Sequence, residues 1–116
     1  MTQVRRIGRK DFMILSTGHL RRYRGSLFSL SVASTHGQRA RSTVVVSKKV
    51  AARAVDRNLI KRRARAVIAT ELKKNDTPHA YLFYARKETL RAPYAHFVAD
   101  ITQLMNDARR GERAPR

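Results

Sequence analysis

The chain has 116 residues, and its 26 Lys and Arg against 8 Asp and Glu give a formal net charge of +18. This length fits one compact domain of roughly 100–200 residues, and hydrophobic residues, at 42% of the chain, are numerous enough to build a core. A charge excess of this size opposes compaction by self-repulsion, so we expect a polyanion to compensate it. Nucleic acid is therefore the favoured class of partner.

A membrane partner fits the sequence less well. No segment reaches the roughly 18 apolar residues of a transmembrane span, and residues 1–6 lack the apolar core of a signal peptide. The chain has no Cys, which excludes disulfides and cysteine-ligated zinc and fits a reducing compartment. We expect a cytoplasmic protein with no membrane partner.

The N-terminal half is predicted to contain a short helix and two strands. The helix covers residues 10–16, after a run of basic residues, and a β-branched segment predicts a strand over residues 42–46. Between them, residues 27–32 alternate strictly between apolar and small polar side chains, which is typical of a half-buried strand. Its apolar face consists of Phe28, Leu30 and Val32, and its polar face of Ser29 and Ser31. We expect the two strands to pair as an antiparallel hairpin.

From residue 51 to about residue 73 the pattern has the period of a helix, uninterrupted by Gly or Pro. Its apolar side chains fall within a sector of about 140° that is expected to face a core; they are Val55, Leu59, Ile60, Ala66 and Val67. On the opposite side, four basic residues follow one another at four-residue spacing: Arg53, Arg57, Lys61 and Arg65. Asn58 and Arg62 lie beside this row. Residues 74–78 have turn composition and end the helix.

Two further elements complete the chain. Residues 80–85 form a continuous apolar run of strand length, which suits a central or well-covered strand. Residues 93–109 carry apolar side chains at helical spacing, with Pro93 at the first position, and predict an amphipathic helix. Phe28, Phe83 and Phe97 are expected in the core. The pattern predicts an α+β sandwich with helices packed on a small sheet, as one domain over residues 1–116 with mobile ends at residues 1–6 and 110–116.

The strongest concentration of charge lies between residues 48 and 65. This segment holds eight Lys and Arg against the single acid Asp56, a net charge of 8 − 1 = +7, and Asp56 is expected to pair with Lys61 or Arg53. Like charges at four-residue spacing repel by a few tenths of a kcal/mol per pair, and a merely solvated face normally mixes Glu with Lys. Nucleic acid binding is thus favoured over a solvated charged face. Guanidinium forks suit phosphates better than base edges.

The sequence offers no catalytic constellation. The histidines are scattered without metal-type spacing; they are His19, His36, His79 and His96. Neither a carboxylate pair nor a histidine pair can be assembled for acid–base or metal-assisted hydrolysis. We expect a binder rather than a catalyst. Phe12, beside a basic run, either packs in the core or stacks on an unpaired base.

The basic segment resembles the bacterial ribonuclease P protein component. The hallmark of that family is an Arg-Asn-x-x-Lys-Arg-x-x-Arg helix shortly after a strand that ends in Ser-Lys-Lys. Here the positions are filled by Ser47, Lys48, Lys49, Arg57, Asn58, Lys61, Arg62 and Arg65. Residues 9–12 look like the first helix of the family and residues 82–87 like its last strand, so the likeness extends over nearly the whole chain.

The resemblance implies a function in tRNA maturation. The family's catalytic RNA removes the 5′ leader from precursor tRNA by metal-dependent hydrolysis, with Mg²⁺ bound mainly by the RNA and no catalytic residue in the protein. The implied contacts with the catalytic RNA are Lys48, Lys49, Arg53, Arg57, Asn58, Lys61, Arg62 and Arg65. A cleft between the helix and the sheet would hold the single-stranded leader, with Phe12, Ser29, Ser31 and Ser47. The implied protein is a monomer in a one-to-one complex with the RNA and also contacts precursor tRNA.

The resemblance also implies a fold. It predicts a small mixed sheet of about four strands packed with three helices, in the order α-β-β-β-α-β-α, with a left-handed strand–helix–strand crossover against the usual right-handed rule. Leu59 replaces a common Arg, and Ser16 and Ser31 replace expected aromatic residues. At roughly 1–3 kcal/mol per stacked base, the loss of two aromatic partners weakens leader binding.

Two other functions compete with this interpretation. A structural RNA-binding protein of ribosomal type would have the same charge and size. A nuclease in its own right would need catalytic groups that the sequence does not offer.

Overall fold

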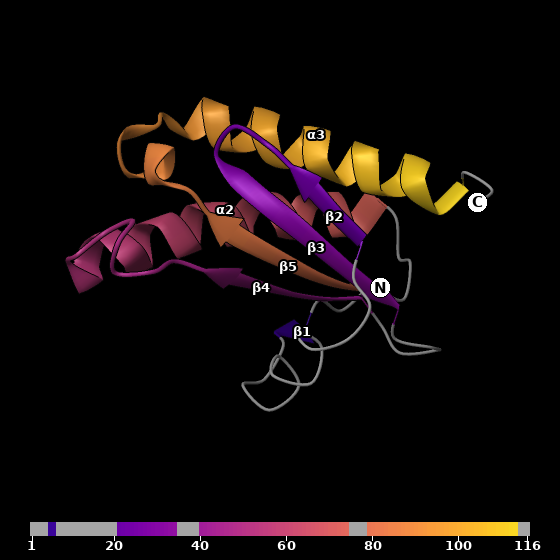
Figure 1. The fold of residues 1–116 in the computed structure, drawn as a ribbon, viewed down its shortest axis with the longest axis horizontal. Coiled ribbons are helices and arrows are strands. Elements are labelled where there is room, and N and C mark those ends of the chain that lie inside the picture. The colour runs from indigo at the N-terminus through magenta and orange to yellow at the C-terminus, as the bar shows by residue number, and fades with distance from the viewer. Residues whose placement is uncertain (1–4, 7–20, 35–39, 75–78, 114–116) are drawn as a thin grey trace.

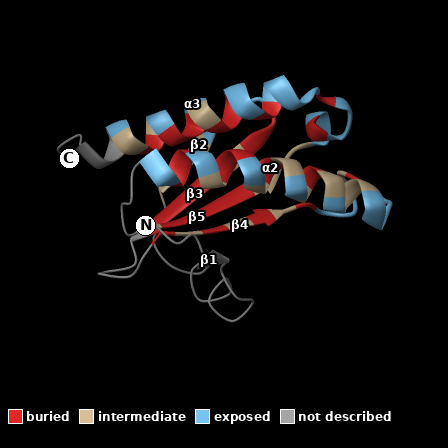
Figure 2. Cartoon of the chain, turned by 180° about the vertical axis from the view of Figure 1, so that it is seen from behind, coloured by how far each residue is buried: buried red, intermediate tan, exposed pale blue. Residues whose placement is uncertain are grey.

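The computed structural model describes residues 5–6, 21–34, 40–74 and 79–113. Its elements in chain order are β1 (Arg5–Arg6), β2 (Arg21–Arg24), β3 (Phe28–Ser34), β4 (Arg41–Val45), α2 (Ala54–Lys74), β5 (His79–Ala85), the 3₁₀ helix η1 (Lys87–Arg91) and α3 (Tyr94–Arg113). Both α-helices cover the same face of one sheet (Figures 1 and 2). The fold is therefore α+β, as predicted. None of the helices in the described part of the chain is long and apolar enough to cross a bilayer.

The strands are ordered β1-β4-β5-β3-β2 across a mixed sheet. β3 runs antiparallel to β2 and β5, whereas β4 runs parallel to β5 and β1. The predicted hairpin between residues 27–32 and 42–46 is wrong, because β5 lies between β3 and β4. β5 takes the centre because it is buried on both faces: Tyr81 and Phe83 join the main core, and Ala80 and Leu82 join a second cluster. The prediction of a central strand at residues 80–85 is confirmed.

The connection from β4 through α2 to β5 joins two neighbouring parallel strands. In Figure 2 the helices lie in front of the sheet, both strands run from left to right, and β5 lies above β4. With the strands turned to point upward, β5 lies to the left of β4. This is the left-handed sense that the resemblance implies, opposite to the usual crossover.

The main core lies between the sheet and the two helices. Phe28 is fully buried, and its ring packs edge-on against Phe83 and Phe97 at centroid distances of 6.3 Å and 5.6 Å. Leu30 and Val32 point to the same core, so the alternation predicted for this strand is confirmed. All three phenylalanines occupy the positions expected from the sequence.

The apolar side of α2 differs from the predicted sector. The helix begins at Ala54, and its buried residues are Ile60, Ala64, Val67, Ile68, Glu71 and Leu72. Val55 is 59% exposed and Ala66 is also exposed, so these two predicted core residues are wrong. The first turns of α2 extend past the ends of β4 and β5 (Figure 1), which leaves Val55 with no sheet to pack against.

Other boundaries also differ from the predictions. The structure describes four strands before the long helix, of which the sequence located only β3 and β4; β1 and β2 were missed. η1 was not predicted, and α3 ends at Arg113 rather than near residue 109. The structure describes two α-helices, and the helix expected over residues 10–16 lies outside the described residues. The mobility expected at residues 1–6 and 110–116 stays a prediction.

One buried carboxylate fixes the hairpin between β2 and β3. Asp100 of α3, 8% exposed, accepts hydrogen bonds from the backbone N–H groups of Ser26, Leu27 and Phe28 at 2.8, 3.0 and 3.0 Å, and from the Ser26 hydroxyl at 3.1 Å. A Cβ at Gly25 would come within 2.5 Å of Asp100 Oδ1, so the turn has room only for glycine. The hairpin is thereby held against α3.

A second buried acid joins the two helices. Glu71 of α2 forms ion pairs with Lys74 at 2.9 Å and with Arg109 of α3 at 3.6 Å. The Arg109 guanidinium also donates to the Glu71 carbonyl oxygen at 2.9 Å. Burying a carboxylate is costly without such partners, so this pairing fixes how the C-terminal halves of the two helices pack.

Candidate nucleic-acid interface

The basic segment begins in the turn between β4 and α2. Ser47, Lys48 and Lys49 are exposed, and the turn is closed by hydrogen bonds from the N–H groups of Val50 and Ala51 to the Ser47 carbonyl at 3.1 and 3.2 Å. Arg53, just before the first residue of α2, is exposed as well. The segment therefore presents three cations to solvent before the helix begins.

Arg57 has a structural role in this turn. It is half-buried, and its Nη1 donates to the carbonyl oxygens of Ala51 at 3.0 Å and Ala52 at 2.8 Å. A guanidinium carries five N–H donors, so the remaining donors are left for a ligand. Asp56 lies in the first turn of α2, where the helix dipole favours a negative charge. Its predicted ion pair with Lys61 or Arg53 is wrong, because no such pair forms among the described residues.

The basic residues of α2 do not all lie opposite the core. Asn58 and Arg62 are exposed, whereas Lys61 and Arg65 are half-buried. The buried residues Ile60, Ala64 and Ile68 also recur at four-residue spacing, one position before Lys61 and Arg65. Adjacent helical residues are about 100° apart, not 180°, so the row runs along the flank of the helix. The predicted placement of the row opposite the core is therefore wrong.

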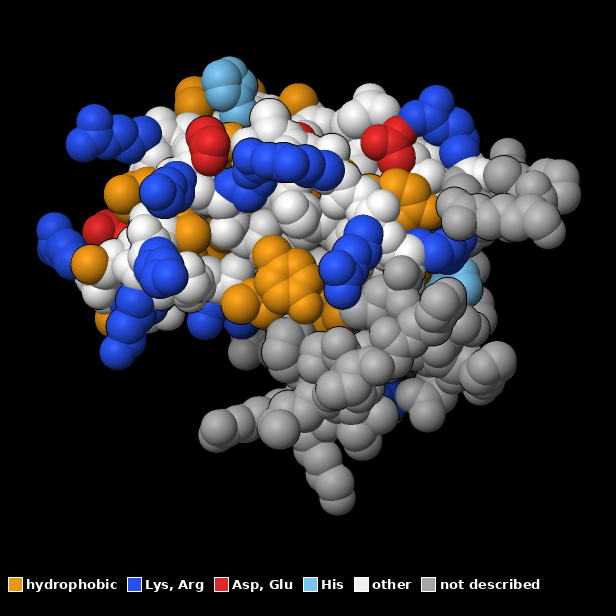
Figure 3. Space-filling view, in the orientation of Figure 1, with side chains coloured by type: hydrophobic (Ala, Val, Ile, Leu, Met, Phe, Trp, Pro, Cys, Tyr) orange, Lys and Arg blue, Asp and Glu red, His pale blue; other side chains and the backbone are white. Residues whose placement is uncertain are grey.

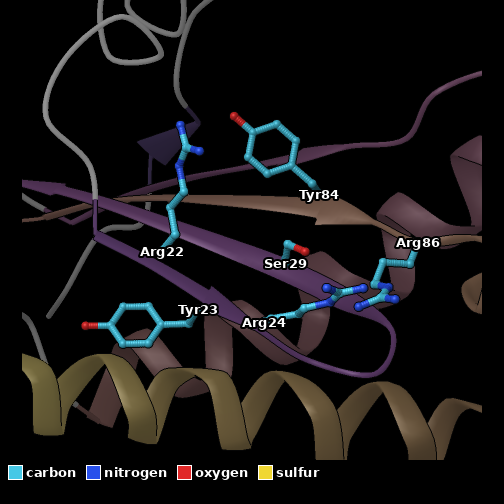
Figure 4. A pocket seen from close by; sticks show the side chains of 6 residues that line it. All are labelled: Arg22, Tyr23, Arg24, Ser29, Tyr84 and Arg86. Atoms are coloured by element: carbon cyan, nitrogen blue, oxygen red, sulfur yellow. The ribbon is translucent and has the colours of Figure 1, made fainter.

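A second basic region lies on the sheet face that points away from the helices. Strand register aligns Arg24 of β2, Ser29 of β3 and Tyr84 of β5 in one row across this face. The next row contains Arg22, Ser31 and Leu82. Because side chains two apart on a strand share a face, both arginines of β2 project to the same side. Figure 4 shows this arrangement, with Tyr23 pointing the other way toward α3.

The small serine of β3 leaves a hollow between the β2 arginines and Tyr84. This hollow, of about 630 Å³, is called here the sheet groove, and it is lined by Arg22, Tyr23, Arg24, Ser29, Tyr84 and Arg86 (Figure 4). Figure 3 views the same face of the molecule and shows hydrophobic side chains near its middle with Lys and Arg side chains on several sides. Among the described residues that line the groove there is no carboxylate, and three are arginines, so this described lining is positively charged.

The side chains of the groove differ in how they are held. The Arg86 guanidinium donates to the Gly25 carbonyl oxygen at 3.0 Å, and the Arg86 backbone N–H donates to the Leu27 carbonyl at 2.8 Å. Arg22 and Arg24 form no side-chain hydrogen bond or ion pair with the rest of the described chain. Burial raises the pKa of Tyr84, and the nearby charge of Arg22 lowers it by a smaller amount. The Tyr84 ring is therefore neutral at physiological pH.

Of the described residues predicted to bind the leader, which are Ser29, Ser31 and Ser47, only Ser29 lines the groove. Ser31 is 6% exposed, Ser47 lies in the turn after β4, and Phe12 lies outside the described residues, as does Ser16. Sequence reasoning missed Arg22, Arg24, Tyr84 and Arg86. The alternation of basic residues around Tyr23, followed by Gly25 and Ser26, was a usable signal of an edge strand before a tight turn.

The described residues offer no obvious metal site. Within residues 5–6, 21–34, 40–74 and 79–113, no three His, Asp or Glu side chains lie close enough together to hold a metal ion. The buried acids Glu71 and Asp100 are already engaged in the contacts described above.

Comparison with known proteins identifies the family. The sequence model of the ribonuclease P family matches residues 3–109, which is nearly the whole chain. The chain belongs to the ribonuclease P protein family. Membership makes it a protein subunit of an endoribonuclease complex whose partner is the ribonuclease P RNA. A search of curated proteins found no match to the sequence.

Solved ribonuclease P proteins have the same fold. The Staphylococcus aureus protein superposes with a TM-score of 0.79 at 20% identity, covering 91% of this chain and 96% of that one. The Thermotoga maritima protein gives a TM-score of 0.71 at 18% identity, covering 85% and 92%. A mutant of the S. aureus protein, described as defective in mRNA degradation activity, gives 0.73 at 20% identity, covering 90% and 87%.

Proposed function

We propose that the protein binds the catalytic RNA of ribonuclease P and the 5′ leader of precursor tRNA. In this proposal the basic segment over residues 48–65 contacts the catalytic RNA. The leader contacts the sheet face that points away from the helices, and not a cleft between α2 and the sheet, because the main core fills that space. The observation that carries the proposal is the family match over residues 3–109, which contains both regions. The protein acts in the cytoplasm, as a single copy per RNA.

The exposure of the basic segment supports its contact with RNA. The cations that point to solvent are Lys48, Lys49, Arg53 and Arg62, with Asn58 beside them; Arg57, Lys61 and Arg65 are half-buried on the flank of α2. These side chains suit a phosphate backbone, which guanidinium and ammonium groups bind with little dependence on base sequence. If about six phosphates are neutralised, the log–log slope of affinity against salt lies near −4 to −5.

Catalysis in this proposal belongs to the RNA. The RNA holds most of the Mg²⁺ and hydrolyses the bond between leader and tRNA, and the protein raises affinity for the precursor. The protein thereby favours precursor over mature tRNA, since mature tRNA has no leader to occupy the sheet face. Protein side chains position RNA and transfer no proton.

The RNA that copurifies with the protein tests the proposal. A cognate ribonuclease P RNA should be the enriched species, and the purified complex should release the 5′ leader from precursor tRNA. Enrichment of ribosomal RNA, with no effect on leader removal, would favour the structural RNA-binding alternative instead. Cleavage by protein that is rigorously free of RNA would favour a nuclease in its own right and contradict the proposal.

A further inference from the structure

The sheet groove combines the aromatic ring of Tyr84 with the guanidinium groups of Arg22 and Arg24, which bond to no other described residue. We propose that Tyr84, Arg22 and Arg24 bind one unpaired nucleotide of the leader, with the base stacked on the Tyr84 ring and the flanking phosphates on the two arginines. This inference rests on the proposed function. The family pattern has aromatic residues at two positions that are Ser16 and Ser31 in this chain. In this proposal the three residues of β2 and β5 take over the leader contact of those missing aromatic residues.

Strand register gives the groove the shape that a nucleotide needs. Arg24, Ser29 and Tyr84 lie in one row, with the smallest side chain in the middle. The serine forms a floor, and the arginine and tyrosine form walls on the neighbouring strands (Figure 4). A base can enter edge-on above Ser29 and lie against the Tyr84 ring. Stacking of this kind tolerates any base, because every base has a π face.

The two arginines of β2 suit the backbone of a single strand. They are two residues apart on one face, so their Cβ atoms are separated by about 7 Å, which is comparable with the spacing of successive phosphates in an extended strand. Arg22 and Arg24 have no hydrogen-bond or ion-pair partner within the described chain. Like charges crowd this face, since Arg86 lines the same hollow. A polyanion relieves that repulsion, so binding is favoured by charge as well as by stacking.

The scaffold around the groove is already rigid before a ligand binds. Asp100 holds the turn between β2 and β3, and Arg86 is bonded to the Gly25 carbonyl in the same turn. The positions of Arg24 and Ser29 therefore need little reordering on binding. Preorganisation of this kind reduces the entropic cost of association.

The test compares two precursor tRNAs bound by the reconstituted holoenzyme, one with a leader of several nucleotides and one with a leader of a single nucleotide. Tyr84→Leu should weaken binding of the long-leader precursor by roughly 5- to 150-fold, the range for one lost base stack. Tyr84→Phe, which keeps the ring, should bind like the wild type. Arg24→Ala should weaken the same substrate and make the salt slope shallower by about one.

Matched controls come from residues outside the groove. Tyr94→Leu changes an exposed tyrosine on α3, and Arg91→Ala removes an exposed cation from η1; neither should alter the preference for the long leader. Equal affinity of wild type and Tyr84→Leu for the long-leader precursor would overturn the inference. So would an equal loss on both precursors, since that pattern reports misfolding or damage to another contact.

The same assay separates this inference from the proposed function. A wild-type protein that neither stimulates cleavage nor distinguishes the two leaders contradicts the proposed function itself. A wild-type protein that prefers the long leader, with the same preference in Tyr84→Leu and Arg24→Ala, contradicts only the role of the groove. Preference lost in both variants and kept in Tyr84→Phe supports the groove.

Discussion

Replacing Asp100 by alanine should destabilise the protein strongly, although Asp100 lies far from the basic segment. The substitution removes the acceptor of four hydrogen bonds. The backbone N–H groups of Leu27 and Phe28, residues that are 5% and 0% exposed, would be left buried without a partner. Ser26 is exposed, so water can replace the acceptor for its N–H and hydroxyl groups. Each buried donor left without a partner costs about 1–3 kcal/mol. Relief from burying a charge offsets part of this, so we expect a net loss of about 3–4 kcal/mol.

Such a loss is large against a total stability of about 5–15 kcal/mol. It corresponds to a fall in Tm of roughly 10–15 °C for a chain of this length. Denaturant unfolding followed by circular dichroism measures it. Asp107→Ala is the matched control, because Asp107 lies on the same helix and its polar partners among the described residues are Gln103 and Arg110, one turn away. This substitution should cost below about 1 kcal/mol. Equal small losses in both variants would refute the structural role of Asp100.

Three further changes test other parts of the structure. Arg57→Ala and Lys61→Ala should each weaken RNA affinity and flatten the salt slope by about one. Only Arg57→Ala should also lower the free energy of unfolding, by about 1–2 kcal/mol, because the Arg57 side chain bonds the carbonyls of the preceding turn and Lys61 does not. Unchanged salt slopes would mean that the basic segment is not the RNA contact. Gly25→Ala should lower the unfolding midpoint, since its Cβ would lie 2.5 Å from a carboxylate oxygen, and a wild-type midpoint would contradict that clash. Spectrophotometric titration should give Tyr84 a pKa above the ordinary value for tyrosine, because burial raises it, and Arg22→Ala should raise the pKa further by removing a charge that lowers it. A pKa that falls in the variant would contradict this contact.

The sequence predicted those features that depend on a single segment. Strict alternation placed Phe28 in the core correctly, and the continuous apolar run at residues 80–85 identified the central strand. The pairing between strands was predicted wrongly, because the sequence rule for hairpins pairs strands that are neighbours in the chain. Here β5 enters between β3 and β4 and forms two ladders, which buries more apolar surface than a hairpin could.

The candidate site was also predicted only where it lies within a single segment of the chain. The basic segment was visible because its residues follow one another in the chain. The helical wheel misplaced the row of basic residues because it assumed that α2 packs along its whole length. The first turns of α2 instead extend past the ends of β4 and β5, and Val55, the second residue of the helix, is exposed. The sheet groove was not predicted from the sequence, because it forms through the pairing of three strands, whose register aligns Arg24, Ser29 and Tyr84 in one row. No spacing within one segment signals such a row.

The Mg²⁺ dependence of precursor cleavage tests the central claim most directly. Cognate ribonuclease P RNA is titrated with Mg²⁺ at fixed ionic strength, with and without the protein, and release of the 5′ leader is measured. The account predicts that the protein lowers the Mg²⁺ concentration needed for half-maximal cleavage. The same Mg²⁺ requirement in both titrations would contradict it.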